Sequence, residues 1–192
     1  FGLRLTPPGT PVEAAMAILL EEEVRKKIKE AWSIVPDFPS GCRLIDPKNW
    51  HFTLAFLDQV DDDNREPLIH LIEQAIENPP KGSFSFNAFE TFPGKHPSYL
   101  IARAVAEERE SWHSFINRLR DLVSVSAPNI DRKPWVPHVT VARAKKGKLL
   151  SKWSEPLQKD INFTPQEITL VKSTPTQNGS VYTDLHVFKF NR

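Results

Sequence analysis

Apolar and polar residues follow two different periods along this chain, which predicts helices and strands in alternation. Apolar positions that recur every three or four residues predict a helix, and apolar positions that alternate predict a strand. The first helix is predicted at Ala14–Leu20, on an apolar stripe that continues towards Trp32. Thr10, Pro11 and Glu13 form a capping box directly before it, which favours a helix over a strand there.

The remaining predicted elements are separated by turns rich in proline, glycine and aspartate. Further helices are predicted at Glu66–Ile76, Trp112–Val123 and Lys148–Leu157. Strands are predicted at Phe1–Leu5, Trp50–Leu57, Phe84–Phe89, Tyr99–Val105, Val136–Ala142, Glu167–Ser173 and Tyr182–Phe190. Several connections are too short for a parallel crossover, so the pattern predicts an α+β fold with mixed or antiparallel sheets.

Composition narrows the class of protein. The chain has 192 residues, 40% of them hydrophobic, which is enough for one domain or two fused half-domains. Its 25 basic and 24 acidic residues leave a net charge of +1, so any contact with nucleic acid must be local. The single cysteine, Cys42, favours a reducing cytoplasm over secretion. The longest apolar run is too short to cross a bilayer, so no membrane role is expected.

Two tetrapeptides of the form His-x-Thr-hydrophobic carry the candidate chemistry. They are His51–Leu54 and His138–Val141, they start 138 − 51 = 87 residues apart, and a tryptophan closely precedes each. Residues two apart on a strand share a face, so each histidine would lie beside its threonine. The repeat predicts a duplicated half-domain with pseudo-two-fold symmetry, in which two sheets form a central cleft and the helices pack outside.

Two imidazoles and two hydroxyls in one cleft suit an in-line displacement at phosphorus. With an ordinary histidine pKa near 6.5, one imidazole can take a proton from water while the other donates one to the departing ribose oxygen. Thr53, Thr140 and Arg143 would hold the non-bridging oxygens. Arg143 stands five positions after His138, so a bulge or the end of the strand must turn it back to this face. If the substrate is a cyclic phosphodiester, its ring is strained and already carries the leaving group, so hydrolysis needs no metal ion. No metal site is therefore expected.

Other classes of site are less well supported by the sequence. No Gly-x-Ser-x-Gly motif occurs, which disfavours a serine hydrolase, and neither tetrapeptide has the further ligands of a zinc site. The alternative for both histidines is a half-buried strand position with no chemistry. Four histidines lack a partner motif and are left out of the candidate site: His70, His96, His113 and His186.

These residues resemble the two-histidine (2H) phosphoesterase superfamily, and specifically the RNA 2′,3′-cyclic phosphodiesterases, also called 2′-5′ RNA ligase-like proteins. The likeness is carried by Phe1–Leu5, Asp46–Leu54, Phe92–Gly94, Pro137–Arg143 and Tyr182–Leu185. One departure stands at Val136, where members often carry arginine.

The resemblance implies a single domain over residues 1–192, made of two lobes that each give one motif. It implies that His51 and His138 are the acid and base, and that Thr53, Thr140 and Arg143 bind phosphate. The expected reaction opens a 2′,3′-cyclic phosphate at an RNA 3′ end, or in a cyclic nucleotide, to a 2′-phosphomonoester. We expect a monomer without cofactor. Open alternatives are 2′-5′ RNA ligation, cleavage of 2′-5′ oligonucleotides, a non-catalytic module that binds RNA ends, and a metal-dependent hydrolase.

Overall fold

The computed structural model describes residues 12–177 and 179–191, and these form an α+β fold. The helices are α1 (Glu22–Ser33), α2 (Arg65–Ala75) and α3 (Arg109–Val123), with short 3-10 turns at Pro47–Asn49 and Asp62–Asn64. The strands are β1 (Val12–Leu19), β2 (Cys42–Leu44), β3 (His51–Val60), β4 (Phe84–Phe92), β5 (Tyr99–Ala106), β6 (His138–Ala144), β7 (Ser154–Phe163), β8 (Glu167–Thr176) and β9 (Gly179–Lys189). The strand predicted at Phe1–Leu5 lies outside the described residues.

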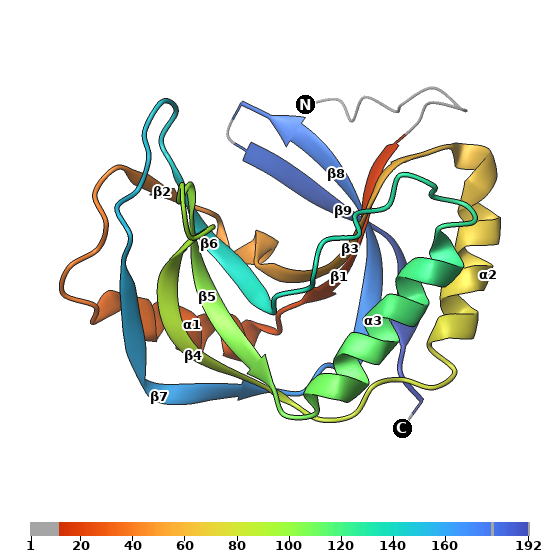
Figure 1. Cartoon of the computed structure of the whole chain (residues 1–192), viewed down its shortest axis with the longest axis horizontal. Helices are drawn as coiled ribbons and strands as arrows, with labels where there is room; N and C mark the ends of the chain where they lie inside the picture. Colours follow the sequence, from red (N-terminus) through yellow and green to blue (C-terminus); the bar gives the residue numbers. More distant parts are fainter. Residues whose placement is uncertain (1–11, 178, 192) are drawn as a thin grey trace.

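The strands form two groups that touch at one point. One group has the order β7-β4-β5-β6, with β2 also on β6, and the other has the order β3-β1-β8-β9. Every described pairing is antiparallel, and β3 and β6 are joined by the single pair Phe52 and Val139. Figure 1 shows the first group on the left and the second towards the right. The predicted α+β class with antiparallel sheets is therefore confirmed.

The helices pack on the outside of these strands. In Figure 1, α2 and α3 lie side by side at the right, and α3 also contacts β3 and β5, whereas α1 contacts β7. The core is aromatic at its centre, where the fully buried ring of Phe52 lies 5.0 Å from that of Phe84 and 5.4 Å from that of Phe86. The strand that bears the first tetrapeptide is thus anchored from below by tightly packed rings.

The helix predicted at Ala14–Leu20 is wrong, because this segment is strand β1. It pairs with β3 on one side and β8 on the other, and five consecutive residues, Ala14–Ile18, are buried. A strand buried on both faces has a continuous apolar run instead of alternation, so its period resembles that of a buried helix. The helix begins later, at Glu22, with Glu22 and Glu23 in its first turn.

The helix predicted at Lys148–Leu157 is also wrong. Its first part has no regular structure, and from Ser154 onwards the chain is strand β7, paired with β4. The backbone of this segment bonds to other parts of the chain: Leu150 N–H donates to the Pro97 carbonyl at 2.9 Å, and Trp153 N–H to the Thr91 hydroxyl at 2.9 Å. These tertiary hydrogen bonds outweigh a weak local helix propensity.

Candidate active site

The two predicted tetrapeptides begin strands β3 and β6 and meet at equivalent positions. Phe52 and Val139 directly follow the two histidines, and they are the one residue pair that joins the strands. Both are fully buried, whereas His51, Thr53, His138 and Thr140 are half-buried. In an antiparallel pair, the position before one partner faces the position after the other. Each histidine is therefore set across from the threonine of the other motif. (His51 faces Thr140, and His138 faces Thr53.)

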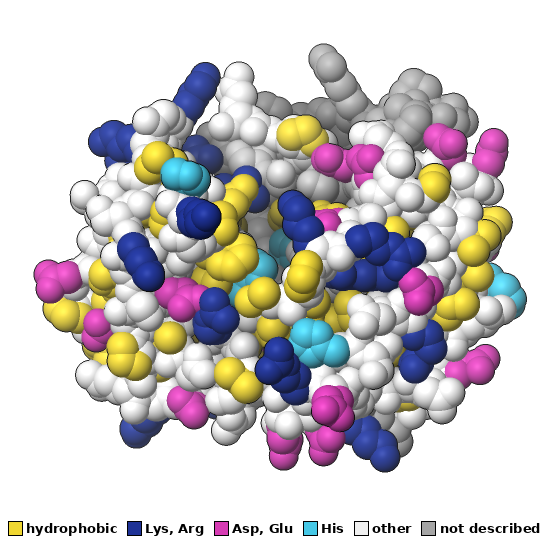
Figure 2. Space-filling view, in the orientation of Figure 1, with side chains coloured by type: hydrophobic (Ala, Val, Ile, Leu, Met, Phe, Trp, Pro, Cys, Tyr) yellow, Lys and Arg dark blue, Asp and Glu magenta, His cyan; other side chains and the backbone are white. Residues whose placement is uncertain are grey.

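All five predicted site residues line a single cavity of about 460 Å³. This volume is within the range typical of small-molecule sites, roughly 300–1,000 Å³. Figure 2 shows this face hollowed between the two halves of the molecule, with a histidine side chain in the hollow and Lys and Arg side chains around it. The cavity thus brings together groups that lie 87 residues apart in the sequence.

The two imidazole rings are held in the same way. Nδ1 of His51 lies 2.6 Å from the carbonyl oxygen of Asn49, and Nδ1 of His138 lies 2.6 Å from that of Val136. A carbonyl can only accept, so Nδ1 carries the proton in both rings and Nε2 has the lone pair when the ring is neutral. His51 Nε2 is 3.1 Å from Thr53 Oγ1, whose hydroxyl can donate to it. Each ring therefore offers Nε2 for proton transfer.

Aromatic side chains fix the position of both rings. Tyr182 of β9 packs edge-to-face on His51 with the ring centroids 4.6 Å apart. Phe92, at the end of β4, packs on His138 at 5.0 Å. The imidazoles are thus oriented by one carbonyl and one aromatic ring each, which limits rotation without using a charged partner.

Burial lowers the pKa of both histidines below the ordinary value of 6.5. For His51, the Asn49 carbonyl raises the pKa, while the positive charges of His138 and Arg143 lower it further. For His138, the Val136 carbonyl raises the pKa, Arg103 lowers it and Glu90 raises it. Because the charge of His138 lowers the pKa of His51, protonation of one ring disfavours protonation of the other. One imidazole can therefore be protonated while the other is neutral.

Arg143 reaches the cavity because of a bulge in β6. Thr140 pairs with Ile101 and Ala142 with Leu100, so Val141 is left unpaired. The two consecutive residues Val141 and Ala142 are both buried, and the next residue, Arg143, returns to the cavity side. The sequence left two alternatives, a bulge or the end of the strand, and the structure shows the bulge.

The first motif has the same bulge at the equivalent residue. In β3, Thr53 pairs with Ala17 and Ala55 with Met16, so Leu54 is unpaired, and 141 − 54 = 87. Phe56 therefore occupies the position equivalent to that of Arg143, since 143 − 56 is also 87. Its side chain is 55% exposed and lines the cavity. The tryptophans that closely precede the two motifs, Trp50 and Trp135, are buried.

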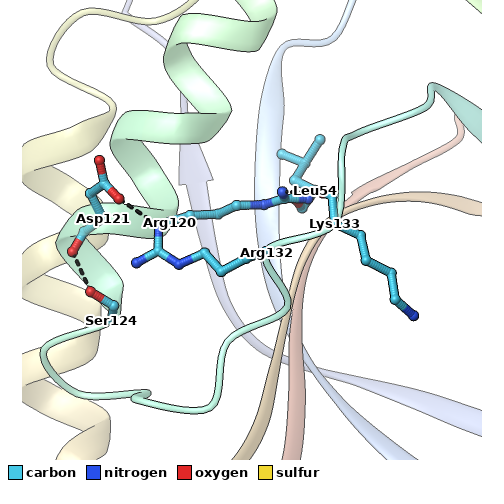
Figure 3. A network of polar contacts seen from close by, with 6 residues as sticks. All are labelled: Leu54, Arg120, Asp121, Ser124, Arg132 and Lys133. Atoms are coloured by element: carbon cyan, nitrogen blue, oxygen red, sulfur yellow. Dashed lines mark hydrogen bonds and ion pairs between the residues drawn. The ribbon is translucent and has the colours of Figure 1, made fainter.

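A buried arginine on α3 holds the first motif against the loop before the second (Figure 3). Arg120 is 8% exposed and donates from Nε and Nη2 to the Leu54 carbonyl at 3.3 and 3.2 Å, and from Nη1 to the Lys133 carbonyl at 2.6 Å. Burial lowers its pKa, Asp131 raises it and Arg132 lowers it. Beside it, Trp135 Nε1 donates to the Thr53 carbonyl at 2.9 Å. These bonds join β3 and α3 to the segment that precedes the second motif.

Sequence reasoning missed several residues of the cavity wall, and Arg120 was the one with a detectable signal. It stands in the apolar stripe of α3, where a charged residue among buried neighbours needs an explanation. Phe92 and Tyr182 lie in segments that carry the family resemblance, but no role was assigned to them. The others lack a signal in the sequence and depend on long-range pairing: Arg43, Tyr99 and Lys133.

Two other kinds of feature are absent from residues 12–177 and 179–191. No three His, Cys, Asp or Glu side chains in this part of the chain form a group that could hold a metal ion. No helix of the described residues is long and apolar enough to span a membrane.

A family model described as the 2′-5′ RNA ligase superfamily matches residues 41–176, which include both motifs. This chain belongs to that superfamily. The resemblance deduced from the motifs is thereby confirmed. The chain is also 24% identical over 183 residues to the RNA 2′,3′-cyclic phosphodiesterase of Methanothermobacter thermautotrophicus, covering 93% of this chain and 98% of the relative. It is 28% identical over 180 residues to the enzyme of the same name from Thermotoga maritima, covering 91% and 94%.

Solved structures have the same fold. The crystal structure of the Thermus thermophilus protein TT0787 matches with a TM-score of 0.74 at 25% identity, covering 93% of this chain and 97% of the other. That of Escherichia coli LigT complexed with 3′-AMP matches with a TM-score of 0.69 at 22% identity, covering 95% and 99%. The likeness therefore extends over nearly the whole chain.

Proposed function

We propose that this chain hydrolyses the 2′,3′-cyclic phosphate at RNA 3′ ends to a 2′-phosphomonoester. The observation that carries the proposal is the pair of imidazoles on one cavity, each with Nδ1 bonded to a carbonyl and Nε2 left for proton transfer. The names of the relatives, RNA 2′,3′-cyclic phosphodiesterase, support this choice of substrate.

In the proposed reaction, Nε2 of the neutral imidazole takes a proton from water as the water oxygen bonds to phosphorus. The bond between phosphorus and the ribose 3′ oxygen breaks, and the protonated imidazole of the other motif gives its proton to that oxygen. One proton is taken up and one is released, so the two rings exchange protonation states and return to the starting state through solvent. The low pKa of both rings supports this exchange near or below pH 6.5.

Thr53, Thr140 and Arg143 would bind the non-bridging oxygens, where negative charge increases in the transition state. Arg143 is suited to this role because its guanidinium keeps its charge and can donate two parallel hydrogen bonds. No step of this scheme requires a metal ion or a cofactor, and we propose metal-independent hydrolysis.

The proposed catalytic unit is one domain over residues 1–192 with two lobes related by the 87-residue offset. Its support is the equal position of the motifs, of the joining pair and of the two bulges. A monomer that acts in the cytoplasm stays a prediction from the sequence.

The test measures turnover of a short RNA that carries a 2′,3′-cyclic end. The reaction contains a chelator, and chromatography separates the product from the substrate. His51→Ala and His138→Ala should each lower the rate by about 10²–10⁴. His70→Ala is the matched control, because His70 lies exposed on α2 and pairs only with Glu73 among the interactions described. Full activity in either motif variant would overturn the proposal, and loss of wild-type activity to the chelator would overturn its metal independence.

Binding of the RNA end without turnover is the principal alternative. It requires no matched acid and base, and it predicts tight binding with no product.

A further inference from the structure

Two arginines stand directly opposite each other at one end of the cavity. Arg43 of β2 pairs with Arg143 of β6, and both side chains are exposed and line the cavity. Directly opposed residues share a face, and like charges in this arrangement destabilise a sheet. Within residues 12–177 and 179–191, neither arginine forms an ion pair. The fold therefore carries an unfavourable pair of charges that an anion between them would relieve.

Other arginines near the site are already occupied. Arg103, which pairs with His138 across the strands, forms an ion pair with Glu90. Arg120 donates to backbone carbonyls. The carboxylate of Asp46, which also lines the cavity, accepts from the Lys48 N–H at 3.0 Å and is not in ion-pair range of Arg43. Arg43 and Arg143 differ from these arginines, because neither guanidinium has a hydrogen-bond acceptor or an ion-pair partner among the described residues.

Neighbouring residues on both sides show where the two side chains lie. Arg143 lies over the ring of Tyr99, 5.4 Å from its centroid, so Arg43, Arg143 and Tyr99 form a row across β2, β6 and β5. On the other side, Nη2 of Arg43 is 4.0 Å from the point where a Cβ of Gly179 would lie, at the start of β9. Arg43 thus spans from one group of strands to the other.

The equivalent position in the first motif has a different chemistry. Phe56 occupies the position that corresponds to Arg143, and its exposed ring offers a surface for a nucleobase. Lys133 and Asp131 also line the cavity, and their opposite charges leave no net charge between them. A nucleotide bound at the histidines therefore meets an aromatic surface on one side and two guanidinium groups on the other.

We propose that Arg43, beside Arg143, binds the phosphate on the 5′ side of the terminal nucleotide. In an RNA chain this group is the last internucleotide phosphate, and a cyclic mononucleotide lacks it. The substrate class is then an oligonucleotide end and not a free cyclic nucleotide. This inference rests on the proposed function, because it takes the reacting phosphate to lie between the histidines.

The first test measures binding of two product analogues, adenosine 2′-phosphate and adenosine 2′,5′-bisphosphate, by isothermal titration calorimetry. A charge-assisted arginine–phosphate contact is expected to make the bisphosphate bind about tenfold more tightly. Arg43→Met removes the charge of an exposed side chain and should abolish this advantage. Lys146→Met is the matched control, because Lys146 is an exposed cation that follows the second motif in the sequence but does not line the cavity. This variant should still bind the bisphosphate more tightly.

The second test compares kcat/KM for a dinucleotide with a 2′,3′-cyclic end and for the cyclic mononucleotide. The wild type should prefer the dinucleotide about tenfold, and Arg43→Met should bring the ratio close to one. The inference would be overturned if the wild type bound the two analogues equally well. It would also be overturned if Arg43→Met lowered the affinity for both analogues by the same factor, or if Lys146→Met removed the advantage of the bisphosphate as Arg43→Met does. Because calorimetry needs no turnover, a protein that binds the bisphosphate through Arg43 and leaves cyclic ends intact would refute the proposed function alone.

Discussion

Replacing Arg120 by methionine tests how the first motif is held. Methionine keeps much of the volume but removes every donor, so the carbonyls of Leu54 and Lys133 lose their described side-chain partner. Leu54 is the bulge residue directly after Thr53, and Lys133 begins the segment that bonds to Thr53 through Trp135. The substitution therefore acts on strand β3, which bears Thr53, without changing either histidine.

The magnitude follows from the three hydrogen bonds. A hydrogen bond to a charged group is worth about 1.5–3 kcal/mol, and an unpaired buried carbonyl costs about 1–3 kcal/mol. Two carbonyls lose their partner, while removal of a buried charge returns part of the desolvation cost. We expect a net loss of about 3 kcal/mol in the free energy of unfolding, a large part of a typical 5–15 kcal/mol. Displacement of Thr53 should lower kcat/KM by about tenfold or more.

The assay combines urea unfolding with kcat/KM on the cyclic-ended RNA. Arg118→Met is the control, since Arg118 lies on the same helix and also bonds backbone carbonyls, those of Ala75 and Asn78, but is exposed and does not line the cavity. It should cost about 1 kcal/mol and keep full activity. Arg120→Met with the stability and activity of this control would refute the reasoning.

Three further predictions concern the cavity. Since the pKa values of both His51 and His138 are lowered, kcat/KM should follow a bell-shaped pH profile centred below pH 6.5. Arg143→Gln should move the inflection due to His51 to higher pH, because the charge of Arg143 lowers the pKa of His51. A profile centred above pH 7 would contradict this prediction. The unfolded chain binds more protons than the folded one between the folded pKa of His51 and 6.5. The free energy of unfolding should therefore be highest above pH 6.5 and fall as the pH decreases through this window. Urea unfolding at pH 7 and pH 5 measures this fall, and the difference between the two pH values should be smaller in His51→Gln than in the wild type. Phe56→Ala should raise KM for the RNA more than it lowers kcat, and an unchanged KM would exclude base stacking there.

The sequence was sufficient where local pattern and chemistry agree. The period of two in each tetrapeptide correctly predicted that each histidine shares a face with its threonine, and the residues between them, Phe52 and Val139, are buried. The five-residue spacing between His138 and Arg143 was enough to require either a bulge or the end of the strand, because alternation alone gives the wrong face. These features depend on neighbours in the chain.

The rest depends on partners that are distant in the chain. Ala14–Leu20 is a strand because β3 and β8 bury both of its faces, and an isolated apolar run contains no record of that. The pairing of Arg43 with Arg143 joins residues 100 positions apart, since 143 − 43 is 100, and it has no local signature. The two tetrapeptides of the candidate site were therefore predictable, whereas the rest of the cavity wall was not.

The most direct test of two-histidine hydrolysis is the fate of one oxygen atom. A short RNA with a 2′,3′-cyclic end would be incubated in ¹⁸O-water with a chelator, and the product analysed by mass spectrometry and phosphorus NMR. We predict a 2′-phosphomonoester that carries one ¹⁸O atom, formed by the wild type and lost in both His51→Ala and His138→Ala. A 3′-phosphate product, or the same labelled product from either variant at the wild-type rate, would contradict the account.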